Sequence, residues 1–325
     1  MEKQKYDGPI LEIDKLSISF FTRLREIPAV MDFSASIMPG EALGIVGESG
    51  CGKSTVALGV MQDLGVNGRI VGGSIKFKGE EMNTMSPERL REIRGSEIAM
   101  IYQEPMASLN PAMKIGEQLM EVPMIHENCS REEAYARALE VVTDVKLPDP
   151  ARILKSYPHQ LSGGQQQRIA LARALVFDPA LVLMDEPLGA LDKQLREHMQ
   201  FEIKHLHESL GITVVYVTHD QGEALTMSDR IAVMDHSKVA QVGTPAQIYE
   251  DPRTAFVAGF IGSPKMNFFS ATDLSPNATK VLGKEVPATQ EVGLRPENMI
   301  ETTADKAVVE GRLELVENLG EYALV

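Results

Sequence analysis

The stretch that most constrains this chain is Gly47-Glu48-Ser49-Gly50-Cys51-Gly52-Lys53-Ser54. It fits the pattern G-x-x-x-x-G-K-[ST], in which glycines let backbone N–H groups turn inward around phosphate oxygens. Residues 41–46 before it predict a strand, and residues 53–64 after it predict a helix whose N-terminal dipole favours an anion. We therefore expect phosphate binding by Gly47, Ser49, Gly50, Cys51, Gly52, Lys53, Ser54 and Thr55.

Working outward from this loop, strand and helix signals alternate. Short apolar runs predict buried parallel strands, and longer periodic runs predict helices. A capping-box signature in Ser130 and Glu133 marks the start of one helix. Strands are expected near 11–18, 97–102, 180–184 and 212–218, and helices at 131–145, 164–176 and 193–209. This alternation predicts an α/β domain.

Two acids, Asp185 and Glu186, end the apolar run 181–184. Ligands of α/β folds bind at the C-terminal ends of strands, so these carboxylates are expected beside the phosphate loop. Asp185 suits Mg²⁺ bound through water, with the Ser54 hydroxyl as a direct ligand. Lys53 is expected to reach the β- and γ-phosphates. Glu186 is expected to polarise the attacking water as general base.

The composition limits both partners and compartment. Lys and Arg number 32 and Asp and Glu number 46, and the net charge of −14 would repel a phosphate backbone, so nucleic acid is not an expected partner. The start of the chain lacks the apolar core of a signal peptide, and no run of about 18 apolar residues occurs. A membrane role would therefore require partner chains.

The two cysteines, Cys51 and Cys129, are too few for a disulfide framework and fit a reducing cytoplasm. Cys51 has two interpretations. It is either a reactive thiol, since a helix N-terminus lowers a thiol pKa, or a small residue that fits the loop.

The sequence pattern changes after residue 240. Residues 1–240 are expected to form the nucleotide-binding domain, with a helical subdomain at about 104–178, and residues 241–266 a linker. Residues 267–325 have short segments and recurring turn signals, which predict a β-rich domain. Because the chain stops at Val325 in a strand-like run, this domain is expected to be incomplete.

The segment Leu161-Ser162-Gly163-Gly164-Gln165 resembles the signature motif of ATP-binding-cassette (ABC) ATPases. Three further elements match that family in order: Gln103 resembles its Q-loop, Gly189-Ala190-Leu191-Asp192 its D-loop, and His219 its switch histidine. The resemblance covers about residues 10–265. The physics agrees, because a serine and two glycines at a helix start offer hydroxyl and N–H donors to an anion.

The resemblance implies an α/β P-loop nucleotide-binding domain with a helical signature subdomain, followed by a C-terminal oligomer-binding-type (OB-like) regulatory domain. It implies an ATPase that uses ATP with Mg²⁺ and works as a head-to-tail dimer, because the signature of one subunit closes over the phosphate loop of the other. The residues that would close the partner's site are Ser162, Gly163, Gly164, Gln165 and Asp192.

The resemblance also assigns roles to single side chains. Gln103 would bind Mg²⁺ and sense the partner, and His219 would contact the γ-phosphate. An aromatic residue near the N-terminus would stack on adenine. Phe20 is the first choice and Phe21 the second, and either could instead be a core residue.

The resemblance is divided between two groups of importers. The phosphate loop and residues 102–111 resemble peptide-importer ATPases. Residues 218–224, 243–249 and 293–297 resemble the ATPases of sugar, glycerol-phosphate and polyamine importers, which carry the C-terminal barrel. We therefore expect uptake of a sugar or a similar small solute, with peptide import as the alternative.

The implied partners are a second ATPase subunit, two transmembrane permease subunits and an extracytoplasmic substrate-binding protein, at the cytoplasmic face of the plasma membrane. Met106, Leu109 and Met113 are expected either to line a groove for a permease helix or to pack in the core. A second class of function is a soluble ABC ATPase that acts on DNA, ribosomes or Fe–S assembly. A regulatory role of the C-terminal domain, in binding a transcription factor or a sugar-phosphotransfer protein, would be additional.

Overall fold

The computed structural model describes residues 6–103, 108–189, 191–276, 278–279, 286–287, 289–300, 302–303, 306–309, 317–318 and 323–324. The chain divides into two compact units, Met1–Arg253 and Thr254–Val325. This division falls inside the segment 241–266 that is predicted to be a linker. The predicted boundaries at 240 and 267 stay predictions.

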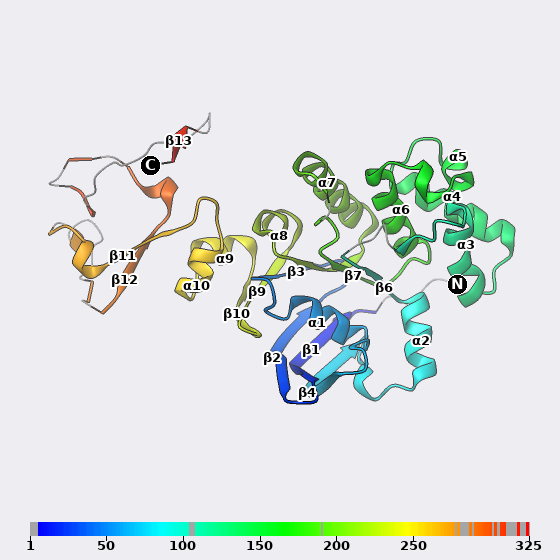
Figure 1. The fold of residues 1–325 in the computed structure, drawn as a ribbon, viewed down its shortest axis with the longest axis horizontal. Helices are drawn as coiled ribbons and strands as arrows, with labels where there is room; N and C mark the ends of the chain where they lie inside the picture. Colours follow the sequence, from blue (N-terminus) through cyan, green and yellow to red (C-terminus); the bar gives the residue numbers. More distant parts are fainter. Residues whose placement is uncertain are drawn as a thin grey trace. The chain divides into compact units, whose positions relative to one another are not determined.

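Strands and helices alternate through most of the first unit (Figure 1). Its strands are β1 (Leu11–Phe21), β2 (Glu26–Ile37), β3 (Ala42–Gly47), β4 (Gly68–Phe77), β5 (Glu80–Glu81), β6 (Ile98–Ile101), β7 (Leu181–Asp185), β8 (Thr213–Thr218), β9 (Arg230–Asp235) and β10 (Lys238–Gly243). Its helices are α1 (Lys53–Val60), α2 (Pro87–Ser96), α3 (Ile115–His126), α4 (Arg131–Asp144), α5 (Pro150–Lys155), α6 (Gly163–Leu175), α7 (Lys193–Leu210), α8 (Gln221–Met227) and α9 (Pro245–Glu250).

The central sheet has six strands in the order β10-β9-β3-β8-β7-β6. The strands from β9 to β6 run parallel, and β10 is antiparallel at the edge. Both faces of this sheet are covered. Leu181 and Leu183 of β7 join the core that contains α1, whereas Val182 and Met184 join the core that contains α6 and α7. The prediction of buried parallel strands is confirmed.

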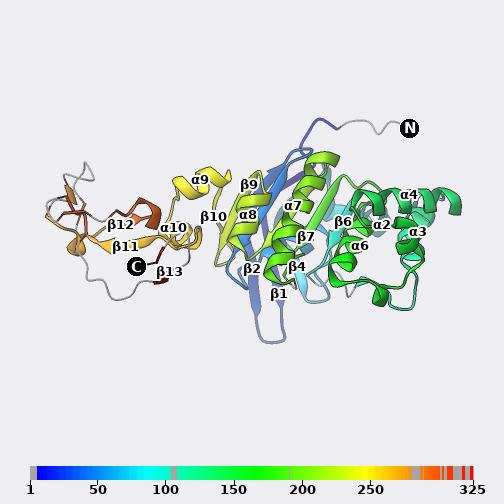
Figure 2. The same cartoon turned by 90° about the horizontal axis from the view of Figure 1, so that it is seen from above.

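A second sheet, antiparallel in the order β2-β1-β4-β5, packs over the α1 side of the central sheet. Figure 1 shows β1, β2 and β4 on the side of the central sheet opposite α7 and α8, and Figure 2 shows the β1–β2 hairpin extending beyond the rest of the unit. Helix α1 contacts both sheets through Val56, Ala57 and Val60, which are buried. The start of α1, which follows the phosphate loop, is therefore held between two sheets.

Helices α3 to α6 form the helical part of the first unit, within the predicted range 104–178. Helix α4 begins with the predicted capping box, in which Ser130 accepts from the Glu133 N–H and Glu133 accepts from the Ser130 N–H. Helix α6 packs on α4 and lies along β6, so the helical part is anchored directly on the central sheet.

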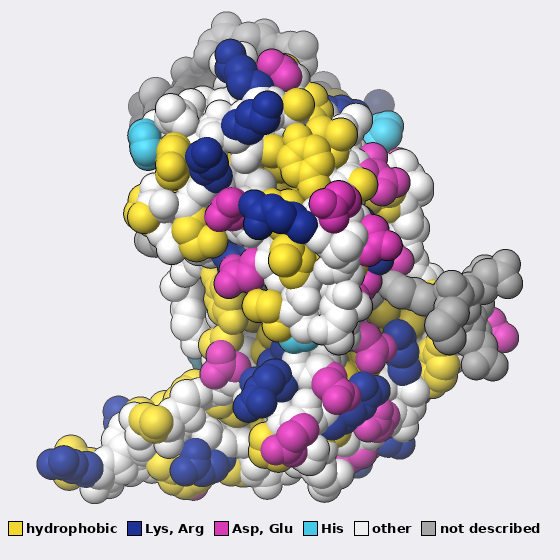
Figure 3. Space-filling model, turned by 90° about the vertical axis from the view of Figure 1, so that its right-hand side faces the viewer, with side chains coloured by type: hydrophobic (Ala, Val, Ile, Leu, Met, Phe, Trp, Pro, Cys, Tyr) yellow, Lys and Arg dark blue, Asp and Glu magenta, His cyan; other side chains and the backbone are white. Residues whose placement is uncertain are grey.

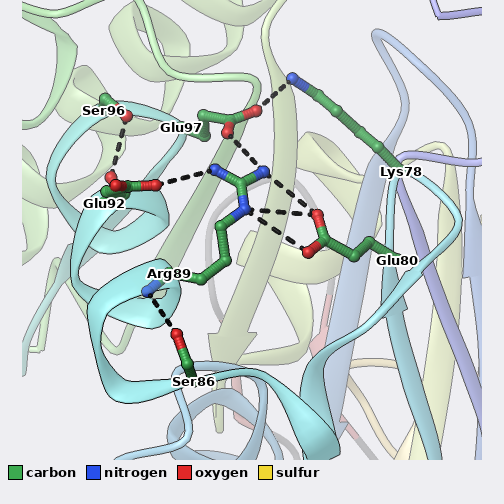
Figure 4. A network of polar contacts seen from close by, with 7 residues as sticks. All are labelled: Lys78, Glu80, Ser86, Arg89, Glu92, Ser96 and Glu97. Atoms are coloured by element: carbon green, nitrogen blue, oxygen red, sulfur yellow. Dashed lines mark hydrogen bonds and ion pairs between the residues drawn. The ribbon is translucent and has the colours of Figure 1, made fainter.

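A polar network holds α2 against β4, β5 and β6 (Figure 4). Arg89 lies at its centre and forms ion pairs with Glu80 at 3.1 Å, Glu92 at 3.4 Å and Glu97 at 3.5 Å. Lys78 adds an ion pair to Glu97 at 2.7 Å. The Glu80 carboxylate raises the pKa of Arg89. Single exposed pairs contribute little. The Arg89–Glu92 pair lies within α2, whereas the pairs with Glu80 of β5 and with Glu97, just before β6, connect α2 to its neighbours.

Figure 3 shows the face of the molecule on the right-hand side of Figure 1, where α2 to α5 lie. Basic and acidic side chains alternate on this face, with hydrophobic side chains between them. Side chains of both signs therefore share the described part of this face. Among the described helices, none is long and apolar enough to cross a membrane.

The second unit begins with α10 (Ala255–Phe260). Strands β11 (Asn267–Ser270) and β12 (Glu291–Leu294) form one antiparallel pair, and β13 (Glu317–Asn318) and β14 (Ala323–Leu324) form another. The side chain of Arg295 is buried and donates to the carbonyls of Ala258 and Ile261. Besides these strands and α10, the described residues of the second unit form two 3₁₀ turns, Ala271–Asp273 and Pro296–Asn298, and they do not make up a barrel, so the β-rich, OB-like domain stays a prediction.

Candidate functional site

The loop between β3 and α1 takes a shape that only glycine permits at two positions. Gly52 has φ +100°, and a Cβ on it would lie 2.1 Å from the carbonyl oxygen of Ala29 in β2. A Cβ on Gly47 would lie 2.3 Å from the carbonyl oxygen of Met234 in β9. The loop backbone is thus pressed between two strands. No side chain caps the first turn of α1, so its backbone donors remain available to a ligand.

Lys53 lies inside this loop rather than in solvent. Its side chain is only 4% exposed, and its ammonium donates to the carbonyls of Gly47 and Glu48 at 2.9 Å each. A buried ammonium needs such acceptors. The charge is therefore held where the sequence predicts a phosphate group, among the exposed residues 48–50 of the loop.

Cys51 is buried in the loop, with 6% exposure. Burial raises the pKa of its thiol, and the opposing influence of Lys53 is smaller. The thiolate is therefore disfavoured at neutral pH. These observations favour the interpretation of Cys51 as a small residue that fits the loop over that of a reactive thiol.

Ser54 and Asp185 meet at the end of β7. The Ser54 hydroxyl donates to Asp185 Oδ1 at 2.7 Å. Burial raises the pKa of Asp185; the Ser54 hydrogen bond opposes this shift and the charge of Glu186 adds to it. The charge of Lys53 also opposes the shift, and a bound cation would further favour the ionised carboxylate.

A magnesium ion fits these oxygen donors. Mg²⁺ prefers a hydroxyl or one or two carboxylates together with water and substrate phosphates, rather than a cage made only of protein ligands. Within the described ranges, no group of three or more His, Cys, Asp and Glu side chains could hold a metal by itself. Ser54 and Asp185 therefore match a site that the nucleotide would complete.

The carboxylate of Glu186 has two polar neighbours from different loops. Gln103 Nε2 donates to Glu186 Oε2 at 3.2 Å, and His219 Nδ1 lies 3.0 Å from the same oxygen. Gln103 follows β6, and His219 follows β8. The structure therefore brings together the three predicted catalytic side chains at the C-terminal edge of the parallel sheet. Glu186 itself has φ +44°, which is uncommon for a residue other than glycine.

The predicted signature lies at the start of α6. Ser162 is its N-cap, and its hydroxyl accepts from the Gln165 N–H at 3.4 Å while Gln165 Oε1 accepts from the Ser162 N–H at 3.0 Å. Ser162 and Gly163 are exposed. These polar groups therefore form hydrogen bonds within their own turn and face outward, where a second subunit could reach them.

Two further predicted residues have clear local roles. Asp192 caps α7 by accepting from the Leu195 N–H at 2.9 Å. Phe20 is half-buried on β1 opposite Gly68 of β4, whereas Phe21 is 41% exposed. Their assignments to the ligand, like those of the other site residues, stay predictions.

The segment after the predicted Q-loop is only partly described. Met106 lies outside the described residues. Leu109 is buried in the core that includes Ile115 and Leu119, so for Leu109 core packing is the favoured interpretation. Met113 is half-buried.

Sequence reasoning missed the polar residues behind His219. Glu223 is 3% exposed and accepts from the Thr218 hydroxyl at 2.6 Å and the Tyr216 hydroxyl at 3.0 Å. Asp220, which lies between Thr218 and Glu223 in the chain, caps α8 and accepts from the Glu223 N–H at 3.2 Å. The available signal was a cap-x-x-Glu spacing directly after a buried strand.

Known proteins with related sequences and structures fit this geometry. The ABC transporter family matches residues 30–189. The dipeptide transport ATP-binding protein DppD of Bacillus subtilis (strain 168) is 36% identical over 268 residues, which cover 82% of this chain and 80% of that protein. The glutathione import ATP-binding protein GsiA of Shigella boydii is 35% identical over 301 residues, 90% of this chain and 48% of that protein. The dimeric post-hydrolysis structure of the ATP-binding cassette MJ0796, bound to ADP and Pi, has a TM-score of 0.63 at 30% identity and covers 72% of this chain and 98% of its own.

Proposed function

This chain belongs to the ATP-hydrolysing proteins of the ABC transporter family, and on that premise we propose that it drives the import of peptides through partner membrane subunits. The observation that carries the proposal is its 36% identity to a dipeptide transport protein over 82% of its length. The similarity to a glutathione importer supports the same class of cargo, since glutathione is a small peptide.

The expectation of a sugar as cargo is accordingly replaced by its alternative. The three segments that favoured it each start a helical turn. Asp220 caps α8, Thr244 caps α9 in a capping box with Gln247, and Arg295 precedes a 3₁₀ turn at Pro296–Asn298. Asp220 and Thr244 are common cap residues because their side chains accept backbone hydrogen bonds, and the buried Arg295 side chain donates to the carbonyls of Ala258 and Ile261. These three residues therefore carry little information about the transported molecule.

The proposed ATP site follows the geometry of the first unit. The open amides of the loop and the Lys53 ammonium bind the phosphates, and Phe20 stacks on adenine. Ser54, Asp185 and Gln103 would hold Mg²⁺, which would neutralise negative charge on the phosphates of the nucleotide. Glu186 polarises the attacking water, and His219 holds the Glu186 carboxylate and contacts the γ-phosphate.

The proposed working unit is a head-to-tail pair of ATPase subunits beneath two permease subunits, fed by an external binding protein. In each pair the outward-facing Ser162 and Gly163 of one subunit close over the loop of the other. The dimeric state of the related cassette MJ0796 supports this arrangement. The proposal places the chain at the cytoplasmic face of the membrane.

Glu186→Gln tests the proposed mechanism. We expect its turnover of ATP to fall by roughly 100-fold or more, the usual contribution of a general base, while ATP remains bound in a stable dimer. ATPase assays and size-exclusion chromatography with ATP measure the two effects. Near-normal ATPase activity would remove Glu186 from its role as base.

An uptake assay tests the cargo. Cells that lack the gene are complemented with the wild-type chain or with Glu186→Gln and given a labelled dipeptide or a labelled sugar. We expect only the wild-type chain to restore dipeptide uptake, and sugar uptake to be the same in both strains. Loss of sugar uptake alone would reverse the choice of cargo.

A further inference from the structure

Gln167 is a buried polar residue on the helix that carries the signature. Its side chain is 5% exposed, in the same helical stripe as Leu171 and Ala174, which belong to the hydrophobic core. A buried amide without a partner is costly. Gln167 satisfies its Nε2 group by donating to the carbonyl oxygen of Pro187.

Pro187 directly follows Glu186, so this hydrogen bond fixes the chain next to the hydrolytic carboxylate. Before it, the Glu186 N–H donates to the Val217 carbonyl of β8 at 2.8 Å. After it, the Gly189 N–H donates back to the Glu186 carbonyl at 3.1 Å. Each of these contacts is backbone to backbone. Gln167 supplies a side-chain contact that holds the same turn from α6.

Two other contacts bind α6 to α7, which follows this turn in the chain. A Cβ on Gly164 would lie 3.3 Å from the side chain of Leu195, so the Leu195 side chain of α7 packs directly against the backbone of α6 there. Arg168 and Glu202 form an ion pair at 3.1 Å, with both side chains 17% exposed. Helix α6 is thus attached both to Pro187 and to α7, which follows residues 187–192.

We propose that Gln167 is a positioning residue for Glu186. Its amide holds the Pro187 carbonyl and thereby keeps Glu186 in its left-handed conformation, with its carboxylate toward Gln103 and His219. This rests on the proposed role of Glu186 as base. The same helix presents Ser162 to the partner, so closure of the partner's site is linked through α6 to the carboxylate of this subunit.

Gln167→Met tests the proposal, because methionine fills a similar volume without a donor. We expect kcat for ATP to fall by roughly tenfold or more while KM stays within about twofold, since only the orientation of Glu186 is disturbed. Gln241→Met is the matched control. Gln241 is also 5% exposed and donates to a loop carbonyl, that of Asp251 at 3.0 Å, but it lies on β10 away from Glu186. Equal kcat values for the two variants, at equal melting temperatures, would overturn the proposal.

A second readout separates positioning from damage to the signature. Gln167→Met is combined with Glu186→Gln, and the ATP-trapped dimer is measured by size-exclusion chromatography. We expect the double variant to form the dimer as fully as Glu186→Gln alone, because the Ser162 edge is unchanged. Loss of the dimer only in the double variant would place the effect at the signature and overturn the proposal. Failure of Glu186→Gln by itself to trap a dimer would instead count against the proposed function.

Discussion

Helices α1 and α6 both begin at a predicted anion-binding turn, but their N-termini are built differently. Helix α1 starts at Gly52, in a left-handed conformation and without a side-chain cap. Helix α6 starts at Ser162, whose capping box with Gln165 satisfies donors within the same turn. Only the α1 turn contains a buried cation, Lys53.

This difference indicates that the turns at the starts of α1 and α6 have different functions. The α1 turn leaves its donors open and adds a charge, so it can bind phosphate without a partner. The α6 turn stabilises its own helix first and offers an exposed hydroxyl. We infer that the α1 turn sets affinity for the nucleotide and that the α6 turn contributes only when two subunits meet.

The largest expected effect tests the α1 side. Lys53→Ala should weaken ATP binding by roughly 100-fold, because each hydrogen bond from a charged group contributes about 1.5–3 kcal/mol and 1.4 kcal/mol is tenfold in Kd. Isothermal titration calorimetry measures the Kd. Lys78→Ala is the control, since Lys78 pairs with Glu97 in the α2 network. An unchanged Kd for ATP in Lys53→Ala would contradict the inference that the α1 turn sets the affinity for the nucleotide.

The next effect tests the α6 side. Ser162→Ala should leave ATP binding by a single chain unchanged but lower ATP turnover by roughly tenfold, because it removes the hydroxyl that we propose closes over the partner's nucleotide. Ser130→Ala is a matched control, since Ser130 forms the same capping box on α4. Both variants should lose about 1 kcal/mol of stability. Equal ATPase rates in the two variants would show that Ser162 acts only as a helix cap and not in ATP hydrolysis.

A smaller effect concerns the charge beside α1. Burial raises the pKa of Asp185, so the folded state holds this proton more tightly than the unfolded chain. Stability is therefore lost as pH rises from the ordinary value of 3.8 through the raised folded pKa. Without nucleotide, Asp185→Asn should raise the melting temperature at pH 7 by about 2–4 °C. Near pH 3 the substitution should leave the melting temperature unchanged. The exposed Asp14→Asn is the control in a melting series over pH, and a lower melting temperature for Asp185→Asn would contradict the sign.

The smallest effect concerns the thiol in the α1 turn. Because Cys51 is buried with a raised pKa, maleimide at pH 7.5 should label the half-buried Cys129 first. Cys51→Ala should keep the Kd for ATP within about twofold, since neither the open amides nor Lys53 depends on sulfur. Peptide mass spectrometry and calorimetry measure these outcomes. Faster labelling of Cys51 would restore the reactive interpretation.

The parts of the site that could be predicted are those that lie close together in the chain. Phosphate binding needs consecutive amides and a lysine at a fixed spacing, so residues 47–54 indicate it directly, and Asp185 and Glu186 follow a strand that alternation already predicts. The family relationship extends this to Gln103 and His219. These two reach Glu186 only because β6, β7 and β8 are neighbours in the sheet.

The parts that could not be predicted depend on contacts between distant segments. The pairing of β1 with β4 and the position of β9 beside β3 join segments far apart in the chain. Gln167 shows the same limit for a single residue, because nothing near it in the sequence identifies the Pro187 carbonyl as its partner. In the second unit the segments are short and alternate weakly, so the sequence does not predict how its strands pair, and the β-rich, OB-like class stays a prediction.

The backbone of Glu186 sets stability and activity against each other. Its φ of +44° costs a residue with a Cβ on the order of 1 kcal/mol, which glycine would not incur. Directed evolution of this chain for thermal stability alone should therefore favour glycine or asparagine at position 186. The selected variants should be more stable to heat but should no longer hydrolyse ATP. A library screened in this way needs a counter-selection for turnover, or position 186 must be held constant.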